Sequence, residues 1–370
     1  MRQFDFFLFE NFDAEQQAHH PLNPRLFPGA GTDALLSFIA SFPAGECSVS
    51  DAREHFGNDK INRLIRGGVL RQAGNALLYD CPIFLQEDAQ VLRSGLKSQA
   101  GQLMEKTKAC FPALLHACEK LQNGFPAQVN LYHILCGMIF DGHFFDVLGQ
   151  RRALATARLH PSGLDYLNVI YEKSADLAAF SDGLLCSYNR LCNAHCALQS
   201  FGDANGNRFD FYRFLRLMEQ DALPPSFHAA KALWQALDGG RETLLSETCA
   251  LVHTGRCHPS ALSLLEHFGY AKDGALCAPV YLPAHQPILH EMASIAEEGM
   301  ADAIMHSLQH LSASLPITAV QHGVSALEIA NELYHLLFGS LNEALVKAGL
   351  VASPPFIHGQ GRFLQCIEIN

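Results

Sequence analysis

Four basic side chains lie close together near residue 65 of this chain: Lys60, Arg63, Arg66 and Arg71. Ile61, Leu64 and Ile65 recur among them at helical spacing, so we expect the first three cations on a helix. Asp59 alone opposes their charge. A locally basic helix is the kind of element that enters the major groove of DNA. We therefore take these four cations as candidate DNA contacts.

The acidic balance of the whole chain limits this interpretation. The sequence has 370 residues, a formal net charge of −11 and only 17% charged residues, so any contact with nucleic acid has to be local. The alternative is a helix whose cations are merely solvated, while this part of the chain docks another protein or packs on the middle of the chain itself. The sequence leaves both interpretations open.

A second concentration of polar side chains occurs between residues 187 and 213, within an apolar region. The candidate ligand-binding residues there are Tyr188, Asn189, Arg190, Asp203, Asn205, Arg208 and Asp210. Such a density of hydrogen-bonding groups suits a cleft for a small ligand. An Asx-rich structural turn, with Arg208 and Arg213 paired to acids such as Asp210, explains the same residues and is the interpretation that we favour.

Part of this stretch matches the calcium loop of an EF-hand. Asp203, Asn205 and Asn207 stand at the first three ligand positions. However, Arg208 replaces the glycine at the sixth position, and Arg213 replaces the bidentate glutamate. A cation in place of that carboxylate removes most of the affinity for calcium, so we expect no calcium site.

The run from Phe201 to Arg208 resembles the signature loop of Fic/Doc-type nucleotide transferases. That resemblance implies phosphate binding at a helix N-terminus. Gln199 stands where the family has its catalytic histidine, and Asn207 is an additional residue in the loop. We therefore do not expect an active transferase.

Cys192, His195 and Cys196 offer soft ligands for a metal if this segment is helical, because thiols at i and i+4 then share a face. The paired-cysteine knuckle typical of zinc sites is absent. We therefore expect buried or half-buried cysteines and no metal. The same interpretation applies to Cys249, Cys257 and His258.

Glu328, Glu332 and His335 fall at i, i+4 and i+7 of an expected C-terminal helix. A stripe of carboxylates and histidine serves the di-metal bundles, but these need a second matching helix and none is evident. We expect a solvated face instead.

The motifs by which common enzymes are recognised are missing. The sequence has no Gly-x-Ser-x-Gly elbow, no phosphate loop, no dinucleotide-binding glycine pattern and no His-Glu-x-x-His motif. An enzyme is therefore not indicated, although one of an unfamiliar type stays open, and we expect no cofactor.

A repeated segment indicates how the candidate residues are positioned. Residues 82–85, Pro-Ile-Phe-Leu, recur as residues 279–282, Pro-Val-Tyr-Leu, at an offset of 197 residues. Each copy follows a helix-like stretch and a turn that contains glycine, at Gly74 in the first copy and Gly274 in the second. A helix, a β-hairpin and a return helix are therefore duplicated. The pattern resembles the winged helix-turn-helix, which implies DNA binding, protein docking or a purely structural role.

The two copies differ in charge. In the first copy we expect three helices, beginning near Thr32, near Ser48 and before Ile61, and then a hairpin, so the cations lie on the third helix. The corresponding stretch of the second copy has Lys272 against Glu266 and Asp273 and lacks a basic face. If the protein contacts DNA, the first copy does so.

We expect a mainly α fold with small β-hairpin wings, in which tandem winged-helix-like modules flank a helical middle domain. The expected segments are an N-terminal strand and arm at 1–29, a module at 30–95, the middle domain at 96–245, a second module at 246–292, and C-terminal helices and a tail at 293–370. The pattern of residues 363–369 predicts a final strand.

The composition predicts a folded, cytoplasmic protein. The sequence is 49% hydrophobic, which is ample for cores, and its 12 cysteines are scattered through apolar surroundings that suit reduced thiols. We find no run of 18 apolar residues and no signal-peptide pattern at the N-terminus.

Our leading hypothesis is a DNA-binding regulatory protein of the winged-helix type, whose helical middle domain senses a ligand or mediates dimerisation. One alternative is an enzyme, or a nucleotide- or ligand-binding protein, with its site at residues 187–213. A second alternative is an adaptor whose modules dock proteins. The partners considered are DNA at the first module, a small molecule, and a protein partner or a second copy of the chain, but no membrane.

Overall fold

The structure is a computed structural model, and it describes residues 2–10, 23–157, 163–173, 180, 185–204, 208–219 and 222–370. The chain is 57% helical and has small sheets, so the expectation of a mainly α fold with some β structure is confirmed. It divides into two compact units. Unit 1 comprises Met1–Glu105, Phe144–Gly183 and Ala301–Leu341, and unit 2 comprises Lys106–His143, Leu184–Met300 and Asn342–Asn370. Each unit is assembled from three separate segments, whereas the sequence suggested five consecutive ones.

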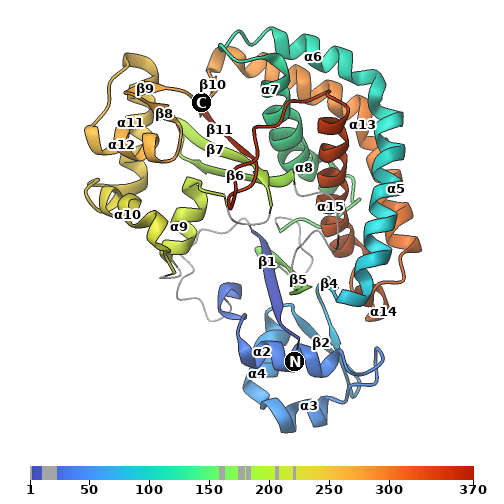
Figure 1. Cartoon of the computed structure of the whole chain (residues 1–370). Helices are drawn as coiled ribbons and strands as arrows, with labels where there is room; N and C mark the ends of the chain where they lie inside the picture. The colour runs from blue at the N-terminus through green and yellow to red at the C-terminus, as the bar shows by residue number, and fades with distance from the viewer. Residues whose placement is uncertain are drawn as a thin grey trace. The chain divides into compact units, whose positions relative to one another are not determined.

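Unit 1 contains three consecutive helices followed by a hairpin (Figure 1). They are α2 (Ala30–Ile39), α3 (Val49–Phe56), α4 (Asn58–Arg66), β2 (Leu70–Ala73) and β3 (Ala76–Tyr79). Ser48 caps α3 by accepting the N–H of Asp51. Gly57 alone separates α3 from α4, with φ at +81°, a left-handed conformation that strains any other residue. The expected helices and hairpin are confirmed, while their relationship to the winged helix stays a prediction.

Burial fixes the orientation of α4. Its side chains Ile61 and Leu64 are buried together with apolar side chains of α2 and of the hairpin. Tyr79 of β3 is also buried, and its hydroxyl donates to the carbonyl oxygen of Leu36 at 2.8 Å. Because one face of α4 is held inward in this way, the opposite face is left to solvent.

The rest of unit 1 supports this module. A sheet of order β1-β5-β4 contains β1 (Phe4–Glu10), β5 (Tyr166–Glu172) and β4 (Ile83–Phe84). The remaining elements are η1 (Pro24–Leu26), η2 (Gln86–Asp88), α8 (Phe144–Gln150) and α14 (Thr318–Gln321). Three helices contribute residues to both units, namely α5 (Ala89–Thr107), α13 (Gln286–Ser314) and α15 (Ala326–Lys347).

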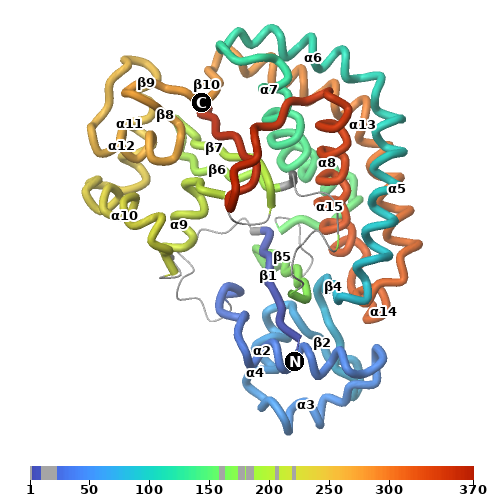
Figure 2. The backbone as a smooth tube through the Cα atoms, viewed as in Figure 1, coloured from blue at the N-terminus to red at the C-terminus, as the bar shows by residue number. Residues whose placement is uncertain are grey.

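Unit 2 is built on a sheet of order β10-β11-β7-β6. Its strands are β6 (Leu185–Cys192), β7 (Cys196–Asp203), β10 (Val280–Tyr281) and β11 (Phe363–Ile369). The last strand β11 lies beside β7, as the backbone trace shows (Figure 2). The strand expected at residues 363–369 is therefore confirmed.

Helices and a second hairpin complete unit 2. The N-terminal helices are η3 (Lys108–Cys110), α6 (Phe111–Glu119), α7 (Ala127–Leu131) and the π-helical η4 (Tyr132–His143). The later helices are α9 (Phe211–Glu219), η7 (Pro225–Phe227), α10 (His228–Gln235), α11 (Gly240–Thr254), α12 (Pro259–His267) and η8 (Pro283–His285). The second hairpin comprises β8 (Ala271–Lys272) and β9 (Ala275–Leu276).

The expectation of a mostly helical middle domain at 96–245 is wrong for residues 166–172, 185–192 and 196–203, which form β5, β6 and β7. Both β5 and β7 are almost completely buried along their length. A strand that is buried on both faces shows an apolar run without alternation, and such a run cannot be told from a buried helix by its period.

The two halves of the chain repeat the same succession of elements and the same strand pairs. Ile83 of β4 lies opposite Ile170 of β5, in parallel strands. Val280 of β10 lies opposite Ile367 of β11, also in parallel strands. The residue numbers of the second pair exceed those of the first pair by 197, which is the offset of the sequence repeat. The turns η2 and η8 and the starts of α5 and α13 have the same offset. The duplication therefore extends far beyond the segment seen in the sequence.

Each unit contains a helical segment that belongs to the other half of the chain. In unit 1, the N–H of Ala155 donates to the carbonyl oxygen of Leu327 at 2.8 Å. In unit 2, the N–H of Ala352 donates to the carbonyl oxygen of Gln128 at 3.1 Å. A Leu-Tyr-His sequence follows both acceptors, at residues 131–133 and 333–335, and both of its histidines are buried. The two copies of the repeat have thus exchanged equivalent helices.

This exchange predicts how the protein behaves when the link between its halves is cut. A cut at a protease site introduced between Lys173 and Leu185 of the full chain should not separate the halves, because each unit contains segments from both sides of the cut. We expect the cleaved protein to elute in size-exclusion chromatography as one particle of the intact mass, and to separate only in denaturant. Elution as two folded halves in native buffer would show that the helices are not exchanged.

One helical stretch, Ala127–Gln150, has the length and apolar composition of a membrane-spanning helix, and 67% of its most apolar part is buried inside the structure. Core helices of soluble proteins have this same character. The stretch is therefore consistent with a soluble protein, and the cytoplasmic location stays a prediction.

Candidate nucleic-acid interface

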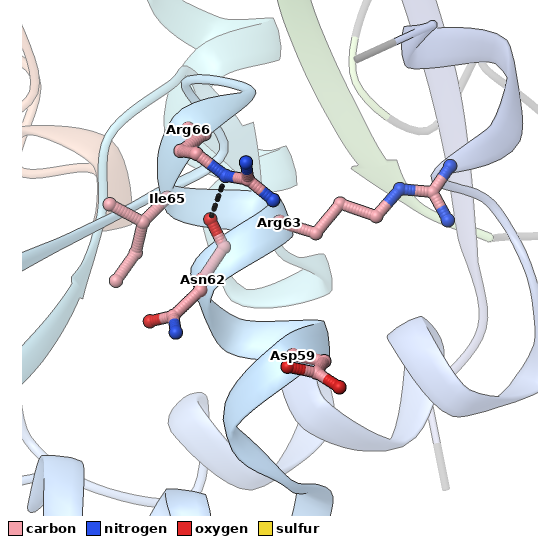
Figure 3. A pocket seen from close by; sticks show the side chains of 5 residues that line it. All are labelled: Asp59, Asn62, Arg63, Ile65 and Arg66. Atoms are coloured by element: carbon pink, nitrogen blue, oxygen red, sulfur yellow. Dashed lines mark hydrogen bonds between the residues drawn. The ribbon is translucent and has the colours of Figure 1, made fainter. Parts of the chain in front are cut away.

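The outward face of α4 carries polar side chains. Asp59, Asn62 and Arg66 are exposed on it, opposite the buried Ile61 and Leu64. Figure 3 shows Arg66 bent back along the helix, where its Nε donates to the carbonyl oxygen of Asn62 at 3.4 Å. This bond is long and stays within one turn of helix, so it leaves most of the guanidinium donors of Arg66 to other partners.

A surface hollow of about 500 Å³ lies along this face. It is lined by Asp59, Asn62, Arg63, Ile65 and Arg66, and we call it the α4 hollow. Arg63 extends away from the helix on the side opposite the Asn62 amide, as the close-up shows (Figure 3). Two cations and an amide thus border an open, concave surface on a single helix.

Arg63 and Lys60 reach from α4 toward the start of α2. The Arg63 guanidinium carbon lies 5.6 Å from the centre of the Phe27 ring, a cation–π distance. The Lys60 ammonium packs against Gly31, where even an added Cβ would lie 2.3 Å from Nζ. These two cations therefore share a location beside the first turn of α2.

Arg71, the fourth candidate DNA contact, is bound within unit 1. Its Nε lies 3.4 Å from a carboxylate oxygen of Asp80, and its guanidinium also donates to the carbonyl oxygens of His322 and Gly323. The His322 Nδ1 accepts the N–H of Tyr79, and burial lowers the pKa of His322 to about 4. Arg71 thus ties the hairpin to α14, so most of its hydrogen-bonding capacity is already used.

Helix electrostatics offers a structural reason for part of this charge. Arg63 and Arg66 lie in the last turn of α4, where cations favour the negative end of the helix dipole. That effect contributes at most about 1 kcal/mol for each exposed cation. It does not explain Lys60, which lies in the first half of the helix.

The second candidate region, at residues 187–213, lies on the sheet of unit 2 and not between two helices. Asp203 ends β7 and is buried, and Arg362 from the segment before β11 lies 2.9 Å from its carboxylate. The same guanidinium lies 2.5 Å from Glu343 of α15. Asp203 also accepts the backbone N–H of Arg362 at 2.9 Å. Its carboxylate is therefore used in a buried ion network.

Arg208 and Asp210 form a second buried ion pair, with Nε and Oδ2 3.3 Å apart. Asp210 also accepts the hydroxyl of Ser200 at 2.8 Å and the backbone N–H of Arg213 at 2.8 Å. The other guanidinium nitrogens of Arg208 donate to Ser187. The local pairing of Arg208 with Asp210 expected for a structural turn is thus present.

The remaining candidates of this region also have partners within unit 2. Arg190 lies 2.9 Å from Glu368 of β11, and Asn189 donates to the hydroxyl of Ser187 at 3.3 Å. The backbone N–H of Tyr188 donates to Asp141 at 2.7 Å, and burial raises the pKa of the Tyr188 phenol well above its ordinary value. Asn205 lies outside the described residues. The described candidates therefore hold the sheet together.

Sequence reasoning missed the partners of this region, which are Glu343, Arg362 and Glu368. They come from α15 and from the C-terminal segment, more than 100 residues away in the sequence. The charges within the final strand were the available signal, because a charged side chain on a buried strand needs a partner.

The three metal-ligand candidates lie on a hairpin and not on a helix, which corrects the helical interpretation. Cys192 ends β6 and Cys196 begins β7, and the side chain of Asn193 accepts the N–H groups of His195 and Cys196 across the turn. His195 is exposed while Cys196 is buried. In the described part of the chain, no group of three or more His, Cys, Asp and Glu side chains is arranged to hold a metal ion.

The solvated face expected for α15 is wrong at Glu332 and His335, which are both buried, whereas Glu328 is half-buried. The hydroxyl of Tyr171 donates to the Glu332 carboxyl group. Burial raises the pKa of Glu332 to about 8, while burial lowers the pKa of His335 to about 3. Both side chains are therefore neutral near pH 7. The helix exchange causes the difference, since it buries this stripe inside unit 1.

No protein-family model matches this chain, and no curated protein or solved structure matches it. What the candidate interface does therefore has to be inferred from its own geometry and charge.

Proposed function

We propose that this protein binds duplex DNA through the outward face of α4 and acts as a regulatory protein of the winged-helix type. The observation that carries the proposal is the α4 hollow, where Asn62, Arg63 and Arg66 border an open surface on a helix joined to α3 by a single glycine. A short helix held at an angle by a preceding helix and a hairpin is the arrangement that places side chains in a major groove.

The chemistry of this face suits DNA better than a protein partner. An arginine binds the O6 and N7 acceptors of guanine with two hydrogen bonds, and an asparagine binds adenine in a similar way. Arginine and lysine also bind backbone phosphates, which contributes affinity without sequence preference. Asn62 and Arg66 are exposed and suited to base edges, whereas Lys60 and Arg63 are suited to the backbone.

The hairpin contributes fewer contacts to the proposed DNA interface than the sequence suggested. Arg71 is bound to Asp80 and to α14, so we assign to it the positioning of the hairpin and not a direct DNA contact. The second module has no comparable face, because α12 carries no lysine or arginine. We therefore infer that each chain has one DNA-binding face, on α4.

The test is fluorescence anisotropy with a labelled random duplex at about 50 mM salt and above. The Arg63→Ala/Arg66→Ala variant should bind at least about tenfold more weakly, and the slope of log K against log salt should fall by about one to two. The matched control is Arg256→Ala/Lys272→Ala, which removes two exposed positive charges from the second module and should bind as the wild type does.

Two results contradict the proposal. One is a wild-type protein that does not bind duplex at low salt. The other is an equal loss of affinity in both double variants, because that loss would reflect net charge and not the α4 face. A selected high-affinity duplex would further allow Asn62→Ala to be tested for a change in base preference.

A further inference from the structure

A second cavity lies between α4 and the start of α2. It has a volume of about 240 Å³ and is lined by Leu26, Phe27, Thr32, Asp59, Lys60, Arg63 and Leu64. We call it the Lys60–Arg63 pocket. Its lining has two cations against the single carboxylate of Asp59, and its other walls are apolar side chains and a hydroxyl. The pocket therefore has an excess of positive charge at a concave surface.

The first turn of α2 adds positive potential to this pocket. Gly29 is the N-cap of α2 and has no side chain to accept its first N–H groups. Thr32 and Asp33 donate to the carbonyl oxygen of Gly29, whereas the N–H groups before them have no acceptor within the helix. The Lys60 ammonium lies against Gly31, so a full positive charge adjoins the positive end of the helix dipole. Asp33, in the same turn, and Asp59, in the pocket lining, offset part of this positive potential.

Arg63 provides an independent indication of a missing acceptor. Its Nε is buried and has no hydrogen-bond partner. Its Nη2 makes one long bond of 3.4 Å, to the carbonyl oxygen of Leu26. The Arg63 side chain is only half-buried, so its terminal Nη donors remain able to reach a ligand in the pocket. A guanidinium held over Phe27 with an unused donor is suited to a phosphate oxygen.

The second unit shows that the fold does not need these cations. The N–H of Val69 donates to Leu64 at the end of α4, and the N–H of Tyr270 donates to Leu265 at the end of α12. This correspondence aligns Lys60 with Ala261 and Arg63 with Leu264. Both counterparts are apolar and completely buried. Since the corresponding helix of unit 2 forms with alanine and leucine at these positions, helix formation alone does not account for Lys60 and Arg63.

We propose that the Lys60–Arg63 pocket binds a phosphate group. Lys60 supplies a point charge, Arg63 supplies directed N–H donors, and the first amides of α2 supply the positive end of a helix. The phosphate belongs either to the backbone of duplex DNA or to a free phosphorylated small molecule. Only the first source rests on the function proposed above, where the pocket would position α4 on the duplex.

The variant for the test is Lys60→Ala/Arg63→Leu, which copies the residues of the second unit and is therefore expected to fold. The first measurement is thermal unfolding in up to about 20 mM inorganic phosphate, with chloride replacing it at constant ionic strength. We expect phosphate to raise the Tm of the wild type and of the Arg256→Ala/Lys272→Ala control, but not that of the pocket variant. The second measurement is the anisotropy assay with random duplex.

The two measurements separate this inference from the proposed function. In one outcome, the pocket variant loses both the phosphate-induced rise in Tm and at least tenfold in duplex affinity. That result supports a phosphate of the DNA backbone as the ligand. A phosphate shift that needs Lys60 and Arg63, in a protein that binds no duplex, supports a free phosphorylated ligand and overturns the DNA function alone. If phosphate does not raise the Tm of the wild type, and the pocket variant binds duplex as the wild type does, the phosphate pocket alone is overturned. If neither probe binds, both proposals fail.

Discussion

Replacing Arg362 with alanine is expected to destabilise unit 2 by about 3–5 kcal/mol, because it leaves the buried carboxylates of Asp203 and Glu343 without their cation. The Asp203 side chain is only 2% exposed, so water cannot take the place of the guanidinium. Arg362 also reaches the two carboxylates from a segment far away in the sequence. The free energy of unfolding, measured by urea denaturation at pH 7, should show this loss.

Lys120→Ala is the matched control for Arg362→Ala. The Lys120 ammonium lies 2.7 Å from Glu291, but both side chains are more than 40% exposed. An exposed ion pair contributes less than about 1 kcal/mol, so this control should remain close to the wild type. If Arg362→Ala costs no more than Lys120→Ala, the network contributes little to stability, and the ligand-binding interpretation of residues 187–213 regains support.

Replacing Glu332 with glutamine is expected to remove the loss of stability that this carboxyl group causes as the pH rises from 6 to 8. The folded protein holds the pKa of Glu332 at about 8, above its ordinary value of 4.5, because burial disfavours the carboxylate. Its contribution to stability is therefore complete below pH 4.5 and is lost as the pH rises through 8. Between pH 6 and pH 8 the wild type should lose about 2 kcal/mol of unfolding free energy through this group.

The comparison of Glu332→Gln with the wild type isolates this effect. Glutamine keeps an acceptor for the Tyr171 hydroxyl and cannot ionise, so the variant should not show the loss of about 2 kcal/mol that Glu332 causes between pH 6 and pH 8. The buried histidines affect both proteins equally. Unfolded histidine is still partly protonated at pH 6, so their contribution to stability rises in both proteins between pH 6 and pH 7, and the difference between the two pH profiles reports Glu332. Glu298→Gln, on the exposed side of α13, serves as the control. Equal pH profiles for the wild type and Glu332→Gln would show that this carboxyl group ionises normally.

The candidate DNA contacts illustrate which part of a site a sequence reveals. Lys60, Arg63 and Arg66 are recognisable because a local helix and its apolar spacing decide where they lie, and the structure has them on such a helix. The role of Arg71 was not accessible, since its partners on α14 are about 250 residues away. Asn62 was missed because an asparagine between arginines has no signal of its own until the exposed face is known.

For the candidate ligand site, the sequence revealed the clustered residues but not what they bind. Asp203, Arg208 and Asp210 attracted attention as a cluster of polar residues, and their clustering was real. Whether such a cluster binds a ligand or its own chain depends on the partners that tertiary structure supplies. Here Arg362 and Glu343 arrive from the C-terminal segment and use the available hydrogen bonds.

By itself the sequence determined the local elements: the three helices and the hairpin before residue 80, the final strand, and the repeat of Pro82 to Leu85 at Pro279 to Leu282. These follow from caps, glycine turns and apolar periodicity, which act over a few residues. Only the tertiary structure decided that helices are exchanged between the two copies, that Glu332 and His335 are buried, and that residues 166–172, 185–192 and 196–203 form strands. Such features depend on contacts between distant segments, and the helical period of α15 is the same whichever copy it packs against.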